Sequence, residues 1–122
     1  MAVFAALQTM DEERVSSGYT RRSLIGEKLM LSWARMQRGM RAAPHSHPHE
    51  QAFWILSGSV QVLIGGQPTH CHAGEVALIP PGQEHEVICL EDTEFLTVLA
   101  PPRVDLAPGA PMPPHLGLGA ES

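Results

Sequence analysis

The stretch "QAFWILSGSVQVLIGGQPTH" (51–70) decides the fold class of this chain of 122 residues. Two apolar runs, 53–56 and 60–64, are separated by "SGS", and a second break, "GGQP", follows. Short runs of β-branched and aromatic residues between glycine and proline breaks are typical of antiparallel strands. The stretch therefore predicts two consecutive strands of a β-sheet.

The flanking sequence repeats this pattern. The segment "LMLSWARMQRGM" (29–40) is predicted to be a strand, because the residues before Pro44 avoid the helical region and continue in an extended chain. A further strand is predicted at 76–79, before Pro80, and two more in "HEVICLEDTEFLTVLAPP" (85–102), separated at Glu91 and Asp92. At least six strands, with no helix expected after the N-terminal segment, predict an all-β sandwich or closed barrel.

Length and charge limit the classes of function. A chain of this length fits one domain. Its net charge of −5, with only 8 lysines and arginines, argues against a nucleic-acid partner. No apolar stretch approaches the roughly 18 residues of a membrane span, and the N-terminus lacks the basic region of a signal peptide, so we expect a cytoplasmic protein without a membrane partner. Cys71 and Cys89 lie in apolar stretches and are expected to be buried thiols, with a disulfide left open.

Histidines are concentrated in "APHSHPHEQ" (43–51), just before the predicted strands. His45 and His47 are two residues apart, so on a strand both rings would point to one face. Gln51 follows four residues later, and His85 comes from a distant strand. Because a metal ion needs neutral imidazoles that converge from separate parts of a fold, these four residues are candidate ligands of a metal ion.

The spacing of these residues resembles the two motifs of the cupin family. The first reads Gly39-x5-His45-x-His47-x3-Gln51-x6-Gly58, and the second reads Gly74-x5-Pro80-x-Gly82-x2-His85-x3-Cys89. Gln51 stands where the family usually has Glu, and Cys89 where it has Asn. The resemblance implies a jelly-roll β-barrel around one metal ion, with loss of the metal as the alternative that the missing Glu leaves open.

A wider part of the chain resembles the small single-domain cupins of pectin degradation, the KdgF type. The stretches "GYTRRSL", "HSHPHEQ", "IPP" and "APPRVDL" carry this resemblance. The family has a catalytic D-x-F-x3-R pattern, which here reads Thr97, Leu99 and Arg103. The domain is expected at 21–106, after an N-terminal extension at 1–20 and before a Pro/Gly-rich tail at 107–122.

The resemblance implies a homodimer, and we place Trp33, with Arg21 and Arg22, at its interface. His70 and His72 flank Cys71 on a short strand; Cys71 is expected to point inward and the two histidines outward. His49 occupies a variable motif position beside the ligands and is a candidate catalytic residue.

The sequence favours a metal-dependent enzyme for a small, anionic substrate. The metal, which the ligands do not identify among Fe, Mn, Ni, Zn and Cu, would act as a Lewis acid in isomerase or lyase chemistry. Arg103 would bind a substrate carboxylate, although a structural ion pair with Asp105 is an alternative. Thr97 lacks the acid–base function of Asp, so the substrate is expected to differ from the family's unsaturated uronate. A dioxygenase, a binding protein without turnover and an inactive scaffold remain alternatives.

Overall fold

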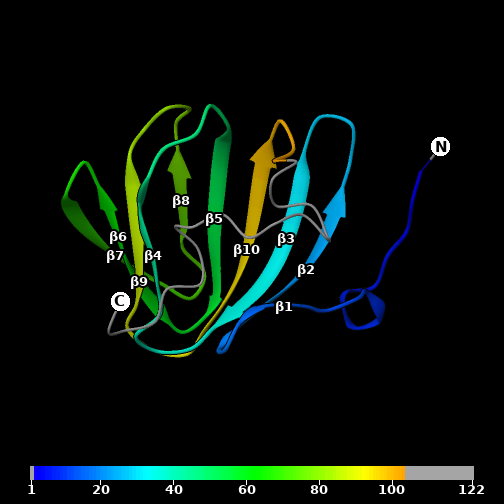
Figure 1. The fold of residues 1–122 in the computed structure, drawn as a ribbon, viewed down its shortest axis with the longest axis horizontal. Helices are drawn as coiled ribbons and strands as arrows, with labels where there is room; N and C mark the ends of the chain where they lie inside the picture. The colour runs from blue at the N-terminus through cyan, green and yellow to red at the C-terminus, as the bar shows by residue number, and fades with distance from the viewer. Residues whose placement is uncertain (1, 104–122) are drawn as a thin grey trace.

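A computed structural model describes residues 2–103, which form ten strands and one short 3-10 helix, η1 (Leu7–Thr9). The strands, in chain order in Figure 1, are β1 (Glu13–Ser16), β2 (Tyr19–Ile25), β3 (Met30–Met36), β4 (Arg41–His45), β5 (Glu50–Ser57), β6 (Ser59–Ile64), β7 (Gln67–His72), β8 (Val76–Ile79), β9 (His85–Cys89) and β10 (Thr93–Ala100). No helix among the described residues is long and apolar enough to cross a membrane.

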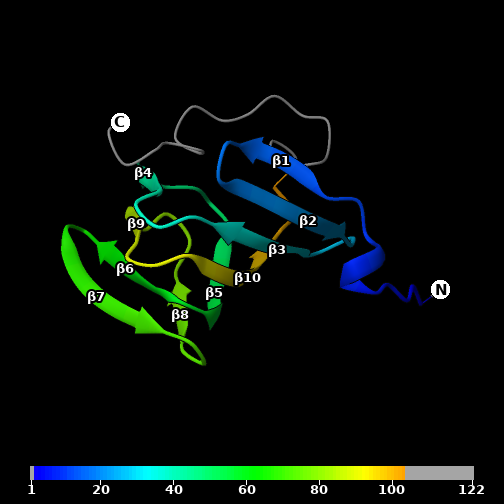
Figure 2. The same ribbon diagram turned by 90° about the horizontal axis from the view of Figure 1, so that it is seen from below.

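The strands form two antiparallel sheets. The larger has the order β1-β2-β3-β10-β5-β8, and the smaller has the order β4-β9-β6-β7 (Figure 2). Neighbouring strands in each sheet are often distant in sequence, as in the pairing of β10 with both β3 and β5. The predicted all-β jelly roll is confirmed, with the difference that hydrogen bonds among the described strands do not close the two sheets into one barrel.

The core lies between the two sheets. Strands β3, β9 and β10 bury alternate residues because successive side chains point to opposite faces. In β10 this places Phe95, Thr97 and Leu99 inside. The Phe95 ring packs edge-on against Phe53 of β5, with centroids 4.7 Å apart, and the same cluster includes Val60 and Val87 from the smaller sheet.

Most predicted strands are confirmed. Segment 29–40 contains β3, the runs 53–56 and 60–64 lie within β5 and β6, and 76–79 is β8. Glu91 and Asp92 separate β9 from β10, as expected. The segment 1–20, assigned to an extension, contains β1 and the first two residues of β2, and the tail predicted at 107–122 lies outside the described residues.

The turn between β5 and β6 requires glycine at position 58. Gly58 has a φ of +87°, and a Cβ there would lie 2.9 Å from the Thr93 Cα and against the Asp92 carbonyl oxygen.

We expect Gly58→Ala to lower the free energy of unfolding by about 3 kcal/mol, from left-handed strain and this overlap together. Gly66→Ala is the matched control, since Gly66 has a similar φ of +82° and open space around it. Its cost should be about 1–2 kcal/mol. Equal losses for the two variants in denaturant unfolding would contradict the proposed overlap.

Candidate metal centre

Three histidines meet at one point, two from neighbouring strands of the smaller sheet and one from the loop after β4. His45 ends β4 and pairs in register with His85, the first residue of β9. The His85 ring centroid lies 4.2 Å from that of His45 and 5.0 Å from that of His47. One nitrogen of each ring can be chosen so that all three lie within 4.8 Å of one another, which is suitable for holding a metal ion.

His47 reaches this point by a different route from the one predicted. The sequence placed it on a strand with His45, but β4 ends at His45 and His47 lies in the following loop. The Gly82 amide donates a hydrogen bond of 2.8 Å to the His47 carbonyl and so anchors the loop to the segment before β9. The prediction of strand alternation was wrong here, although the predicted convergence of the rings is correct.

Each of the three rings has its Nδ1 next to a backbone carbonyl. The distances are 2.7 Å from His45 to Ala43, 3.1 Å from His47 to His49 and 2.8 Å from His85 to Gln83. A carbonyl only accepts hydrogen bonds, so each Nδ1 carries the proton and each Nε2 keeps its lone pair. This arrangement is typical of metal-binding histidines, whose other ring nitrogen is hydrogen-bonded outside the site.

Gln51 of β5 adds an oxygen to the three nitrogens. Its Oε1 lies 3.2 Å from Nε2 of His47, so two lone-pair atoms face each other when His47 carries its proton on Nδ1. Nε2 of His85 is buried and has no hydrogen-bond partner among the described residues. A shared cation would satisfy these atoms, and the donor set therefore fits a bound metal.

The surroundings keep the imidazoles of His47 and His85 neutral. Burial, assisted by the positive charge of Arg103 and by His85, lowers the pKa of His47 to about 4. Burial also lowers the pKa of His85, with a smaller opposing effect from its hydrogen bond to Gln83. Both rings are thus in the form that binds metal at neutral pH.

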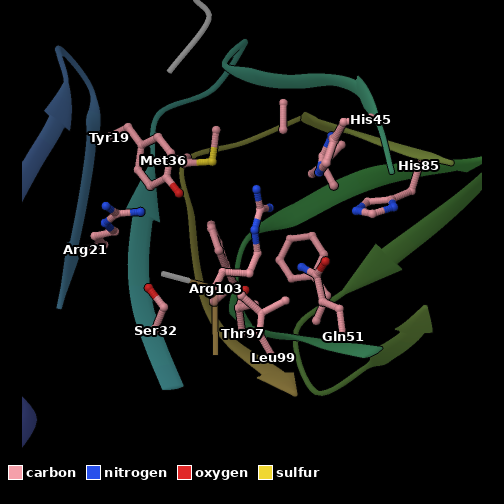
Figure 3. Close-up of a pocket in the computed structure, with 14 residues that line it drawn as sticks. Tyr19, Arg21, Ser32, Met36, His45, Gln51, His85, Thr97, Leu99 and Arg103 are labelled. Atoms are coloured by element: carbon pink, nitrogen blue, oxygen red, sulfur yellow. The ribbon is translucent and has the colours of Figure 1, made fainter. Parts of the chain in front are cut away.

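A pocket of about 70 Å³ lies between the sheets beside these residues. Figure 3 shows His45, His85 and Gln51 along one side and Arg103 near the middle, with Thr97 and Leu99 below it. Arg103 is 8% exposed, and Thr97 and Leu99 are also buried. The residues that the sequence aligned with the D-x-F-x3-R pattern therefore all line one pocket. The full lining comprises Tyr19, Arg21, Ser32, Met36, Ala42, His45, Gln51, Phe53, His85, Val87, Phe95, Thr97, Leu99 and Arg103.

The opposite wall of the pocket was missed from the sequence. It includes Tyr19 and Arg21 of β2 and Ser32 of β3. Arg21, which the sequence analysis placed at a subunit interface, is buried within the chain and pairs with Glu13. The interface itself stays a prediction. Arg22 points to the other face, where its guanidinium carbon lies 4.9 Å from the Trp33 ring centroid. Alternation along β2 could have separated the two arginines.

The remaining histidines and the two cysteines singled out from the sequence are not among the residues that line the pocket. His49 is half-buried and packs edge-on against His47, with centroids 5.2 Å apart, but it is not among the lining residues. The predicted orientations on β7 are confirmed: Cys71 is buried, whereas His70 and His72 are exposed. Cys71 and Cys89 are free thiols, and burial raises the pKa of Cys89 to about 11, so that thiol stays protonated at neutral pH.

Comparisons with known proteins agree with this geometry. The pectin degradation protein KdgF of Dickeya dadantii is 26% identical over 96 residues, covering 76% of this chain and 87% of the relative. The structure of KdgF from Halomonas sp. superimposes with a TM-score of 0.82 at 24% identity, covering 87% of this chain and 99% of that one. An RmlC-like cupin from Shewanella frigidimarina gives a TM-score of 0.81 at 22% identity, with coverages of 88% and 97%.

The family model described as "Cupin domain" matches residues 32–100, which include every proposed ligand and most of both sheets. With its two-sheet fold and its histidine cluster, this chain belongs to the cupin family and is a small cupin similar to KdgF.

Proposed function

We propose that this cupin is a metal-dependent enzyme that catalyses isomerase- or lyase-type proton transfer on a small oxo acid or related carboxylate. The observation that carries the proposal is the convergence of three imidazole lone pairs and one amide oxygen beside a buried arginine in a small pocket. His45, His47, His85 and Gln51 would hold one divalent ion. When bound, such an ion polarises a substrate oxygen as a Lewis acid.

The charge of the pocket supports an anionic substrate. All four proposed ligands are neutral, so they would leave the charge of a dication uncompensated. Arg103 adds a positive charge, and the residues that line the pocket include no Asp or Glu. Arg103 can bind a carboxylate through paired N–H donors and so orient the substrate.

The volume of the pocket supports a small substrate. A volume of about 70 Å³ holds roughly five to seven water molecules at about 10–15 Å³ each. Its walls are mainly apolar, with a few polar groups that would fix orientation, as is common in ligand sites. The relative named for pectin degradation points to sugar acids. Thr97 and Leu99, in place of the Asp and Phe of the resembling pattern, favour a smaller carboxylate than an unsaturated uronate.

A binding protein without turnover is the second candidate, because the pocket wall lacks a carboxylate that could move protons. The metal-loaded protein should be incubated with unsaturated uronates, 2-oxo acids and 1,3-dicarbonyl acids, under air and under nitrogen. Isomerised product in both atmospheres would support the enzyme. Product under air alone would favour a dioxygenase, and tight binding without product would favour the binding protein.

The ligand assignment predicts the metal content of variants. His85→Ala removes a buried ring nitrogen from the cluster and should reduce the metal from about one to below about 0.2 equivalents per chain. His70→Ala is the matched control, because His70 is exposed on β7, away from the lining of the pocket. Elemental analysis of the purified proteins measures both. Full occupancy in His85→Ala would show that the ligand set is wrong.

The role of Arg103 predicts a selective loss of carboxylate binding. Arg103→Leu should weaken binding of a small carboxylate by roughly 10- to 100-fold, since charge-assisted hydrogen bonds are lost. Arg38→Leu removes the same net charge from an exposed position and should bind normally. Calorimetry gives the affinities, and circular dichroism checks the fold. Unchanged affinity in a folded Arg103→Leu protein would give Arg103 a structural role only.

The neutral amide of Gln51 predicts opposite changes in metal and anion binding. Gln51→Glu introduces a negative charge of similar shape beside Nε2 of His47. We expect at least about tenfold tighter metal binding and about tenfold weaker binding of an anionic substrate. Competition with a chelator and calorimetry of the loaded protein measure the two. Tighter binding of both metal and anion would contradict the electrostatic account.

A further inference from the structure

The pocket lacks an evident group to transfer a proton. The ring nitrogens of His45 and His85 are committed, because Nδ1 donates to a carbonyl and Nε2 faces the proposed metal. Arginine stays protonated, and the hydroxyls of Ser32 and Thr97 do not ionise near neutral pH. Among the residues that line the pocket, this leaves the phenol of Tyr19.

Tyr19 is placed to meet a substrate. It lies on the inner face of β2, pairs with Met36 of β3 and is 8% exposed. In the view of Figure 3 the phenol lies across the pocket from His45, His85 and Gln51, with Arg103 between them. A molecule that contacts both Arg103 and the histidine side therefore occupies the space that Tyr19 also lines.

The charges around Tyr19 suit a proton donor. Burial raises the pKa of Tyr19, Cys89 and Glu13 add to the increase, and Arg21 opposes it by its charge and a hydrogen bond. The phenol therefore holds its proton at neutral pH. The positive charge of Arg21 would stabilise the phenolate that remains after proton transfer. Glu13 orients Arg21, with 2.7 Å between its Oε1 and Nε of Arg21.

We propose that Tyr19 is the acid–base residue of this pocket and that Arg21, held by Glu13, is its positioning residue. The proposal rests on the proposed function. In the conversion of an enol to a ketone, the phenol proton forms a C–H bond with the electron pair of the C=C bond, and the enol oxygen becomes a carbonyl oxygen. The proton lost from the enol hydroxyl returns to the phenolate through solvent, so Tyr19 ends in its initial state.

The first test separates Tyr19 from the proposed function as a whole. Metal-loaded wild type should catalyse exchange of the hydrogens next to the carbonyl of pyruvate and acetoacetate in D₂O, measured by proton NMR. Tyr19→Phe keeps the ring that packs in the core and should lower kcat by about 10²–10³-fold, with KM and metal content within about threefold of wild type. Thr20→Val, which removes a hydroxyl from the opposite face of β2, should retain full activity.

The outcomes of this test are distinct. Activity of Tyr19→Phe within threefold of wild type would overturn the assignment of Tyr19 and leave the proposed function intact. Absence of exchange in the wild type, for both acids, would overturn the proposed function and this proposal with it.

A second test does not depend on activity. Tyr19 is the only tyrosine of the chain, so labelling at Cζ gives one NMR resonance that reports its ionisation. Arg21→Met should raise the pH at which this resonance titrates, because a neighbouring positive charge is removed. Oxalate bound to the metal-loaded wild type should also shift the resonance. Binding of oxalate by calorimetry without any shift would show that Tyr19 lies apart from the ligand and would overturn the proposal.

Discussion

Three hydrogen bonds from imidazole nitrogens to backbone carbonyls orient the centre of this protein. Each carbonyl belongs to a residue two positions from its histidine: Ala43 for His45, His49 for His47 and Gln83 for His85. These local hydrogen bonds therefore set the tautomer and help to set the direction of each ring. The sheet has the separate task of bringing these oriented rings together, which the register between His45 and His85 accomplishes.

The local origin of these hydrogen bonds explains why the histidine cluster could be predicted from the sequence. Both the hydrogen bonds and the turns that support them act over a few residues, so they leave a fixed spacing between His45, His47 and Gln51 and between Gly82 and His85. The strands were readable for a similar reason, since alternation and glycine breaks are local properties. His47 shows the limit of that reasoning, because the spacing placed it in the histidine cluster although the assumed strand ends two residues earlier.

The far wall of the pocket was not readable, because it depends on tertiary contacts. Tyr19 and Arg21 lie in "GYTRRSL", whose two adjacent arginines suggest an exposed strand. Burial of Arg21 is favourable only because Glu13, on the neighbouring edge strand, compensates its charge. The pairing of β1 with β2 supplies this contact, and no spacing rule predicts it. A buried arginine therefore remained hidden until the register of the sheet was known.

The two buried arginines of the pocket differ in their surroundings. The charge of Arg21 is balanced by Glu13, and its N–H groups are engaged by that carboxylate and by Tyr19. In the view of Figure 3 Arg103 lies between the histidines and Tyr19, and its positive charge adds to burial, the larger cause, in lowering the pKa of His47. The charge of Arg103 thus acts toward the histidines, whereas the charge of Arg21, near Tyr19, is paired with that of Glu13. In the proposed reaction, Arg103 would bind the carboxylate of the substrate. The carbon atoms of the substrate would then face the phenol of Tyr19, which is the proposed proton donor to carbon.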